Sequence, residues 1–233
     1  MHQPRNPDIA QASLLEGYGG PWFVPENVEA VIRPAEGYLL FLALLPDEAE
    51  AGVLAQYAVQ YCKALQLKYS LPPRRLHITL LPLMLFPYGV PIPQLIIDAA
   101  KDAATSVARL SAIPVAFDSA RSMGKDHYAL ALCCDPSSQT FITVLQRTLA
   151  QALKRRGLGP RAAGGTAHMS LCYHNTSPIG LHPVLDAPSF TARRLALLLS
   201  HRGNSHYEPI AEWRLIEQRV KLVGGESRTE YGP

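Results

Sequence analysis

Apolar residues cluster into short runs along this chain, and the spacing within each run predicts an element. Residues 38–45 are almost continuously apolar, which predicts a buried strand. Residues 76–83 and 166–173 alternate apolar and polar positions within apolar surroundings and predict two further strands. A helix is expected to begin at 46–48, where acidic residues suit a helix N-terminus, and to end near 67. Further helices are expected at 94–110 and 137–156.

The remaining pattern predicts an antiparallel hairpin and two closing strands. Residues 113–120 and 127–134 are strand-like and flank a loop at 121–126, in which Gly124 suits a hairpin. Residues 190–200 and 211–222 are expected to close the sheet. Each half of the chain then contributes one of the strands 76–83 and 166–173 beside one or two helices. The order predicts a pseudo-duplicated α+β protein.

The chain is expected to hold one domain with extensions at both ends. Residues 1–36 are rich in polar and turn residues and predict an N-terminal extension, with at most a short helix near 9–16. Residues 37–223 are expected to form a single bilobed domain, followed by a polar tail at 224–233. No apolar run is long enough to span a bilayer, and the start of the chain does not resemble a secretory signal. These features predict a cytoplasmic protein.

Composition narrows the chemistry only slightly. The chain has 233 residues, of which 48% are hydrophobic, and a formal net charge of +3. This charge suits phosphate ligands or a short RNA end but is too small to indicate extended nucleic-acid binding. Four cysteines, at 62, 133, 134 and 172, do not have the spacing of a zinc site. They are expected to be reduced and mostly buried.

Two short segments carry the candidate chemistry. His77 and Thr79 lie in one predicted strand, and His168 and Ser170 lie in the other, each pair two residues apart. Because side chains alternate across a strand, each histidine shares a face with its hydroxyl residue. Two imidazoles that each have a neighbouring hydroxyl suit acid–base chemistry on an anionic substrate.

These paired motifs resemble the 2H phosphoesterase superfamily, and more narrowly its bacterial 2′-5′ RNA ligase and 2′,3′-cyclic phosphodiesterase branch. The resemblance extends from about residue 38 to residue 222. It implies a bilobed, pseudo-duplicated fold in which two antiparallel sheets with flanking helices surround a central groove. It also implies hydrolysis of 2′,3′-cyclic phosphates, or reversible 2′-5′ RNA ligation, without a cofactor or metal. The catalytic residues it implies are His77, Thr79, His168 and Ser170.

In such a reaction one histidine accepts a proton from water and the other donates a proton to the leaving ribose oxygen. The hydroxyls of Thr79 and Ser170 would donate hydrogen bonds to the non-bridging phosphate oxygens. The sequence leaves the acid and the base unassigned. For opening to a 2′-phosphate, we take His77 as the general acid and His168 as the general base.

Several other residues are candidates for binding the substrate. Arg75 and Arg161 are candidates for holding a phosphate, and exposed solubilising charge is the alternative for both. Tyr173 and His174 stand where some members of the superfamily have an arginine. Simple alternation gives His174 the parity of His168 and Ser170, with a surface histidine as the alternative. Tyr207 is a candidate for stacking on a nucleobase, with a core aromatic as the alternative.

Three functions compete on these observations. The first is a metal-independent phosphodiesterase that acts on an RNA end or a small cyclic nucleotide, with no membrane and no obligatory protein partner. The second is a non-catalytic protein that binds RNA ends or nucleotides and retains the groove. The third is a metal-dependent hydrolase that uses His201 and His206.

Overall fold

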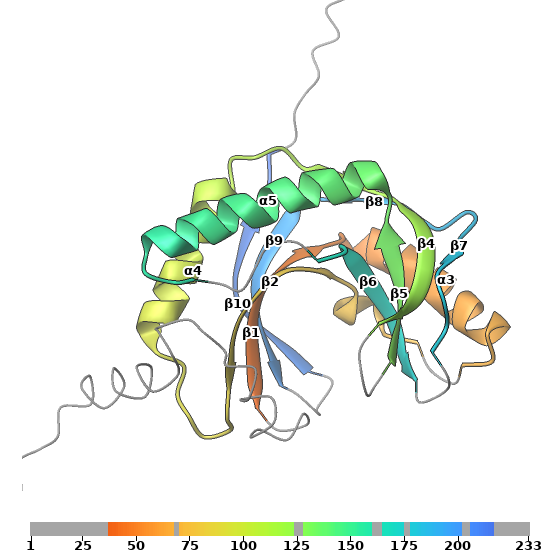
Figure 1. Cartoon of the computed structure of the whole chain (residues 1–233), viewed down its shortest axis with the longest axis horizontal. Coiled ribbons are helices and arrows are strands. Elements are labelled where there is room, and N and C mark those ends of the chain that lie inside the picture. The colour runs from red at the N-terminus through yellow and green to blue at the C-terminus, as the bar shows by residue number, and fades with distance from the viewer. Residues whose placement is uncertain are drawn as a thin grey trace, which may run out of the picture.

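The computed structural model describes residues 37–67, 70–123, 128–159, 165–174, 178–201 and 206–216. The predicted N-terminal extension 1–36, its short helix and the polar tail 224–233 lie outside these residues, as does Arg161. Within them, the order of helices and strands confirms the α+β class (Figure 1). No helix in these ranges is long and apolar enough to span a membrane.

The main layer is an eight-stranded antiparallel sheet with the order β10-β9-β1-β2-β6-β5-β4-β7. Its strands are β1 (Tyr38–Leu45), β2 (Ile78–Phe86), β4 (Phe117–Met123), β5 (Tyr128–Cys134), β6 (His168–His174), β7 (His182–Pro183), β9 (Arg194–His201) and β10 (His206–Arg214). The two sheets that the sequence predicts therefore join as one. The join lies between β2 and β6, the two strands of the histidine motifs.

This join is narrow. The register between β2 and β6 consists of one residue pair, Ile78 with Met169. On either side of it, four strands pair side by side, and Figure 1 shows the two halves bending away from each other into an arch. The bilobed character is thus a property of one bent sheet.

Three α-helices, α3 (Glu48–Ala64), α4 (Gln94–Val107) and α5 (Pro136–Arg155), contribute to one hydrophobic core against this sheet. Side-chain caps mark the start of α3 and of α5. The Asp47 backbone N–H donates to Glu50 Oε2 at 3.0 Å ahead of α3, and the Ser138 N–H donates to Asp135 Oδ1 at 2.8 Å at the start of α5. Helix α5 contacts α4, β2 and β5, so it reaches strands from both halves of the sheet (Figure 1).

Two predicted strands are split in the structure. The segment predicted as 113–120 forms β3 (Ile113–Val115) and β4, and the segment predicted as 190–200 forms β8 (Phe190–Ala192) and β9. β3 and β8 pair with each other in a small second sheet, so the chain changes sheets at Ala116 and Arg193. Ser138 Oγ accepts the Ala116 N–H at 2.9 Å and holds the first crossing point.

The last strand also differs from its prediction. β10 begins at His206 and ends at Arg214, whereas the apolar pattern places it at 211–222. The pairing of β10 with β9 starts at His206 opposite His201. Glu208 and Pro209 are exposed members of this strand, and their polar or turn-forming character hides the first half of the strand from the pattern.

The four cysteines are free and buried, as predicted. They lie at positions 62, 133, 134 and 172.

Candidate active site

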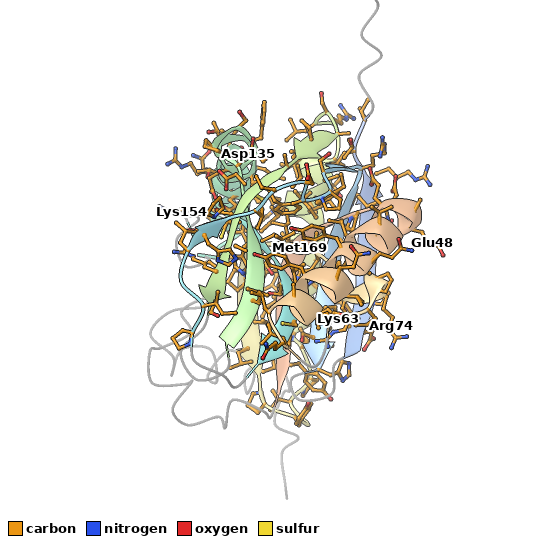
Figure 2. All side chains as sticks on the ribbon, turned by 90° about the vertical axis from the view of Figure 1, so that its right-hand side faces the viewer. Glu48, Lys63, Arg74, Asp135, Lys154 and Met169 are labelled. Atoms are coloured by element: carbon orange, nitrogen blue, oxygen red, sulfur yellow. The ribbon has the colours of Figure 1, made fainter. Side chains whose placement is uncertain are left out.

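Both histidine motifs lie beside the pair that joins the two halves of the sheet. Ile78 and Met169 are the one pair in the register of β2 with β6, and extending this antiparallel register by one residue on each side sets His77 against Ser170 and Thr79 against His168. Directly opposed residues have Cβ atoms about 5 Å apart. Figure 2 labels Met169 at the middle of the sheet, inside the molecule. Each histidine therefore faces the hydroxyl residue of the other motif.

The two imidazoles are held in the same way. Nδ1 of His77 lies 2.8 Å from the Arg75 carbonyl oxygen, and Nδ1 of His168 lies 2.8 Å from the Thr166 carbonyl oxygen. A carbonyl only accepts, so Nδ1 carries the proton in both rings. Nε2 of each ring is left for other chemistry, and among the described residues it has no hydrogen-bond partner.

The hydroxyls of Thr79 and Ser170 are similarly available. Both residues are half-buried, and neither hydroxyl is hydrogen-bonded to a described residue. The site thus offers two hydroxyl donors and two imidazole Nε2 atoms, and none of the four has a hydrogen-bond partner among the described residues. The register of the two strands fixes their positions.

His77 lies in an aromatic enclosure. Its ring centroid is 5.2 Å from that of Phe41 and 5.1 Å from that of Tyr207, and the two enclosing rings are 5.7 Å apart. Burial lowers the pKa of His77 to about 4; the hydrogen bond to the Arg75 carbonyl raises this pKa in part, and electrostatic repulsion from the neighbouring His168 and Arg75 lowers it further. At neutral pH, His77 is therefore an uncharged imidazole.

Arg75 lies between the two halves of the sheet. Its guanidinium carbon is 5.2 Å from the centre of the Tyr207 ring on β10 and 5.9 Å from the centre of the Tyr173 ring on β6. Its position follows from the turn η1 (Pro73–Arg75) just ahead of β2. No ion pair joins Arg75 to a carboxylate within the described part of the chain.

A β-bulge in β6 determines which residue after Ser170 lies on the same face of the sheet as His168 and Ser170. Ala131 of β5 pairs with Ser170, but the next residue, Leu130, pairs with Cys172, so Leu171 is the extra residue. Position 173 therefore continues the phase of His168 and Ser170, and position 174 falls out of phase. The alternation that assigned His174 to this phase is wrong, because it passes through the bulge.

The first motif is also followed by a β-bulge. Ala43 of β1 pairs with Thr79, and its neighbour Leu42 pairs with Leu81, so Leu80 is the extra residue. The Leu80 carbonyl accepts a hydrogen bond from Nε2 of the buried Gln146 on α5 at 3.0 Å. In both strands the bulge comes directly after the hydroxyl residue, which extends the predicted duplication from the motifs to the backbone.

Three other basic residues, Arg74, His182 and His201, have different surroundings. Arg74 is exposed at the periphery (Figure 2). His182 donates through Nδ1 to the Gly180 carbonyl and hydrogen-bonds Tyr61 through Nε2, and His201 contacts Glu208. No three metal-ligating side chains come together in the ranges that the structure describes. Tyr207, which the sequence suggests for stacking on a nucleobase, packs against the His77 ring and the Arg75 guanidinium.

Sequence reasoning misses two residues near the motifs. Phe41 sits in a uniformly apolar run, where only the register with β2 reveals that it shares a face with Thr79. The pattern assigns Arg121 to a hairpin loop, but Arg121 belongs to β4 and pairs with Ala131, which in turn pairs with Ser170. A prediction that extended this strand to Met123 would have placed Arg121 on the same face as every second residue of the strand.

Comparison with known proteins supports the architecture. No family model matches the chain, and no curated protein matches it. Among solved structures, E. coli LigT in its apo form superposes with a TM-score of 0.55 at 18% identity, covering 78% of this chain and 99% of LigT. The crystal structure of a phosphoesterase gives a TM-score of 0.55 at 15% identity, covering 78% of this chain and 100% of that chain.

The chain has the 2H phosphoesterase fold. A third structure with this fold, TT0787 of Thermus thermophilus, has a TM-score of 0.54 at 14% identity and covers 77% of this chain and 99% of its own. LigT has also been crystallised with phosphate and with 3′-AMP. The resemblance inferred from the two motifs is confirmed at the level of the 2H fold.

Proposed function

We propose that this chain is a phosphoesterase that opens 2′,3′-cyclic phosphates, on RNA ends or on small nucleotides, by two-histidine acid–base catalysis. The observation that carries the proposal is that the two motifs flank the one residue pair joining β2 to β6, Ile78 with Met169, and that both histidines are held through Nδ1, with both Nε2 atoms unpaired among the described residues. The phosphate and 3′-AMP complexes of LigT, which has the same fold, support a ligand of this chemical class.

In this proposal His77 is the general base and His168 is the general acid, which is the opposite of the assignment taken from the sequence. The reason for the choice is that an imidazole with a pKa of about 4 is uncharged at neutral pH and can accept a proton. Water attacks phosphorus as its proton passes to Nε2 of His77, and a bond forms between the water oxygen and phosphorus. The bond from phosphorus to the ribose oxygen breaks, and that oxygen takes the proton from Nε2 of His168.

The remaining groups stabilise the charge on phosphorus. Thr79 and Ser170 donate their hydroxyl protons to the non-bridging oxygens, where negative charge increases in the transition state. Arg75 adds a positive charge whose guanidinium is held by Tyr173 and Tyr207. If a 5′-hydroxyl is the attacking group in place of water, the same four groups catalyse 2′-5′ ligation.

The direct test is ³¹P NMR of adenosine 2′,3′-cyclic phosphate with purified protein in EDTA. We expect the wild type to convert it to a single phosphomonoester, and His77→Ala and His168→Ala each to lose about 10²–10⁴-fold in rate. His182→Ala is the matched control, because His182 has the same backbone tether but bonds Tyr61 outside the site. Absence of turnover by folded wild type, with binding retained, would replace the proposal with a nucleotide-binding protein.

A further inference from the structure

Two arginine side chains near the motifs have a donor that lacks an acceptor. Nε of Arg75 and Nε of Arg121 are buried and have no hydrogen-bond partner, and they are the only such side-chain donors among the described residues. A buried donor without an acceptor costs stability, so each one calls for an explanation. A ligand that supplies the acceptors explains both.

Arg121 approaches the motifs from the second half of the sheet. Arg121, Ala131 and Ser170 form a row across β4, β5 and β6 on one face. The side chain of Ala131 is only a methyl group, so the guanidinium can extend over it toward β6. Nη2 of Arg121 donates to Thr166 Oγ1 at 3.2 Å. The carbonyl of Thr166 is the group that holds His168.

The charge of Arg121 has no counterion in the described part of the chain. Arg156, Arg193 and Arg194, in contrast, form ion pairs with carboxylates. Arg75 reaches the motifs from the turn ahead of β2, and Arg121 reaches them from β4, which is three strands away in the sheet. Two guanidinium groups without a carboxylate partner among the described residues, one ahead of β2 and one on β4, match two separate anionic groups, since each one favours a phosphate or carboxylate.

We propose that Arg121 binds a second phosphate of the substrate, on the 5′ side of the nucleoside that carries the cyclic phosphate. The proposal rests on the cyclic phosphodiesterase function, because Arg75 and the two motifs take the reacting phosphate. The preferred substrate is then an RNA end or a nucleotide with a 5′-phosphate. A plain nucleoside 2′,3′-cyclic phosphate leaves Nε of Arg121 without an acceptor.

The kinetic test compares adenosine 2′,3′-cyclic phosphate with its 5′-phosphorylated form. We expect the wild type to have a kcat/KM about 10- to 100-fold higher for the 5′-phosphorylated substrate, the range for charge-assisted hydrogen bonds. Arg121→Gln should bring the ratio of the two kcat/KM values close to one, and Arg121→Lys should keep part of it. The matched control Arg147→Gln, an exposed position on α5, should leave the ratio unchanged.

A wild-type ratio near one would overturn the proposal. So would an Arg121→Gln variant that slows both substrates equally, because Arg121 would then act only through Thr166 and His168. Calorimetric binding of 3′-AMP and adenosine 3′,5′-bisphosphate separates this proposal from the catalytic one. Tighter binding of the bisphosphate that Arg121→Gln abolishes supports the phosphate site even without turnover, and turnover without that preference supports only the cyclic phosphodiesterase function.

Discussion

Ile78 and Met169 face each other across the narrowest part of the sheet, and neither side chain is exposed to solvent. Each lies between the two polar residues of a His-x-Thr/Ser motif. Their side chains anchor the motifs in the core, while the flanking positions carry His77, Thr79 and Ser170 to the other face. One apolar pair therefore sets the register of all the proposed catalytic groups.

Replacing Met169 with alanine should destabilise the protein. The side chain is fully buried in the main core, so we expect a loss of about 2–5 kcal/mol in the free energy of unfolding. Urea denaturation measures it. Val144→Ala, at an exposed position on α5, is the control and should change stability by less than about 0.5 kcal/mol. Equal effects of the two substitutions would mean that Met169 contributes no core packing.

The pH dependence of kcat/KM should show the low pKa of His77. With a pKa of about 4, His77 takes up a second ring proton only in acid, so kcat/KM should fall below about pH 4. Initial rates measured across the acid range give this limb. An acid limb centred near the ordinary histidine value of about 6.5, with none near 4, would contradict the low pKa of His77.

Tyr207→Ala should raise the pKa of His77 toward its ordinary value of 6.5, because water then reaches a ring that the tyrosine encloses. Titration of the imidazole proton signals by NMR measures the change. Phe141→Ala, which removes an exposed aromatic ring on α5, should leave the pKa unchanged. A pKa that stays near 4 in Tyr207→Ala would show that Tyr207 does not account for the shift.

Arg75→Gln should weaken substrate binding more than Arg74→Gln. Arg75 is half-buried between two tyrosine rings, whereas its neighbour Arg74 is exposed. Loss of a charge-assisted contact to phosphate should raise KM about 10- to 100-fold. Initial-rate kinetics on adenosine 2′,3′-cyclic phosphate give both values. Similar KM values for the two variants would remove Arg75 from the phosphate site.

The hydroxyl groups should act on kcat. Thr79→Val and Ser170→Ala each remove one donor aimed at the non-bridging oxygens, and we expect kcat to fall about 10²–10³-fold with little change in KM. Thr79→Ser and Ser170→Thr retain the hydroxyl and should recover most of the activity. Variants without the hydroxyl that keep full kcat would show that these side chains serve the strands alone.

Strand alternation is sufficient to predict the two motifs, because each histidine and its hydroxyl lie within three residues. It fails at Tyr173 and His174 because a β-bulge lies before them. A bulge arises from the pairing of two strands, so the sequence of one strand does not reveal it. The enclosure of His77 depends on Phe41 and Tyr207, which are distant in sequence. Contacts of this kind come from sheet order, and local periodicity does not encode sheet order.

The role of Arg121 is hidden for a related reason. The polar residues near Gly124 indicate a loop that begins at 121, but the strand continues to Met123 because its other positions pair with β5. The split at Ala116 escapes prediction because an apolar run does not reveal which of two sheets it joins. In both cases tertiary pairing overrides the local signal.

Helix α5 shares a core with Ile78 and Met169, so it covers the face of the sheet opposite to the one that strand alternation gives the histidines. It contacts β2 in one half of the sheet and β5 in the other (Figure 1). Because only one residue pair joins β2 to β6, the packing of α5 against both halves helps to set the angle between them. The distance between the two imidazoles therefore depends on this helix as well as on the two strands that carry them. Substitutions at its buried surface, such as at Gln146, act on the reaction geometry from the far side of the protein.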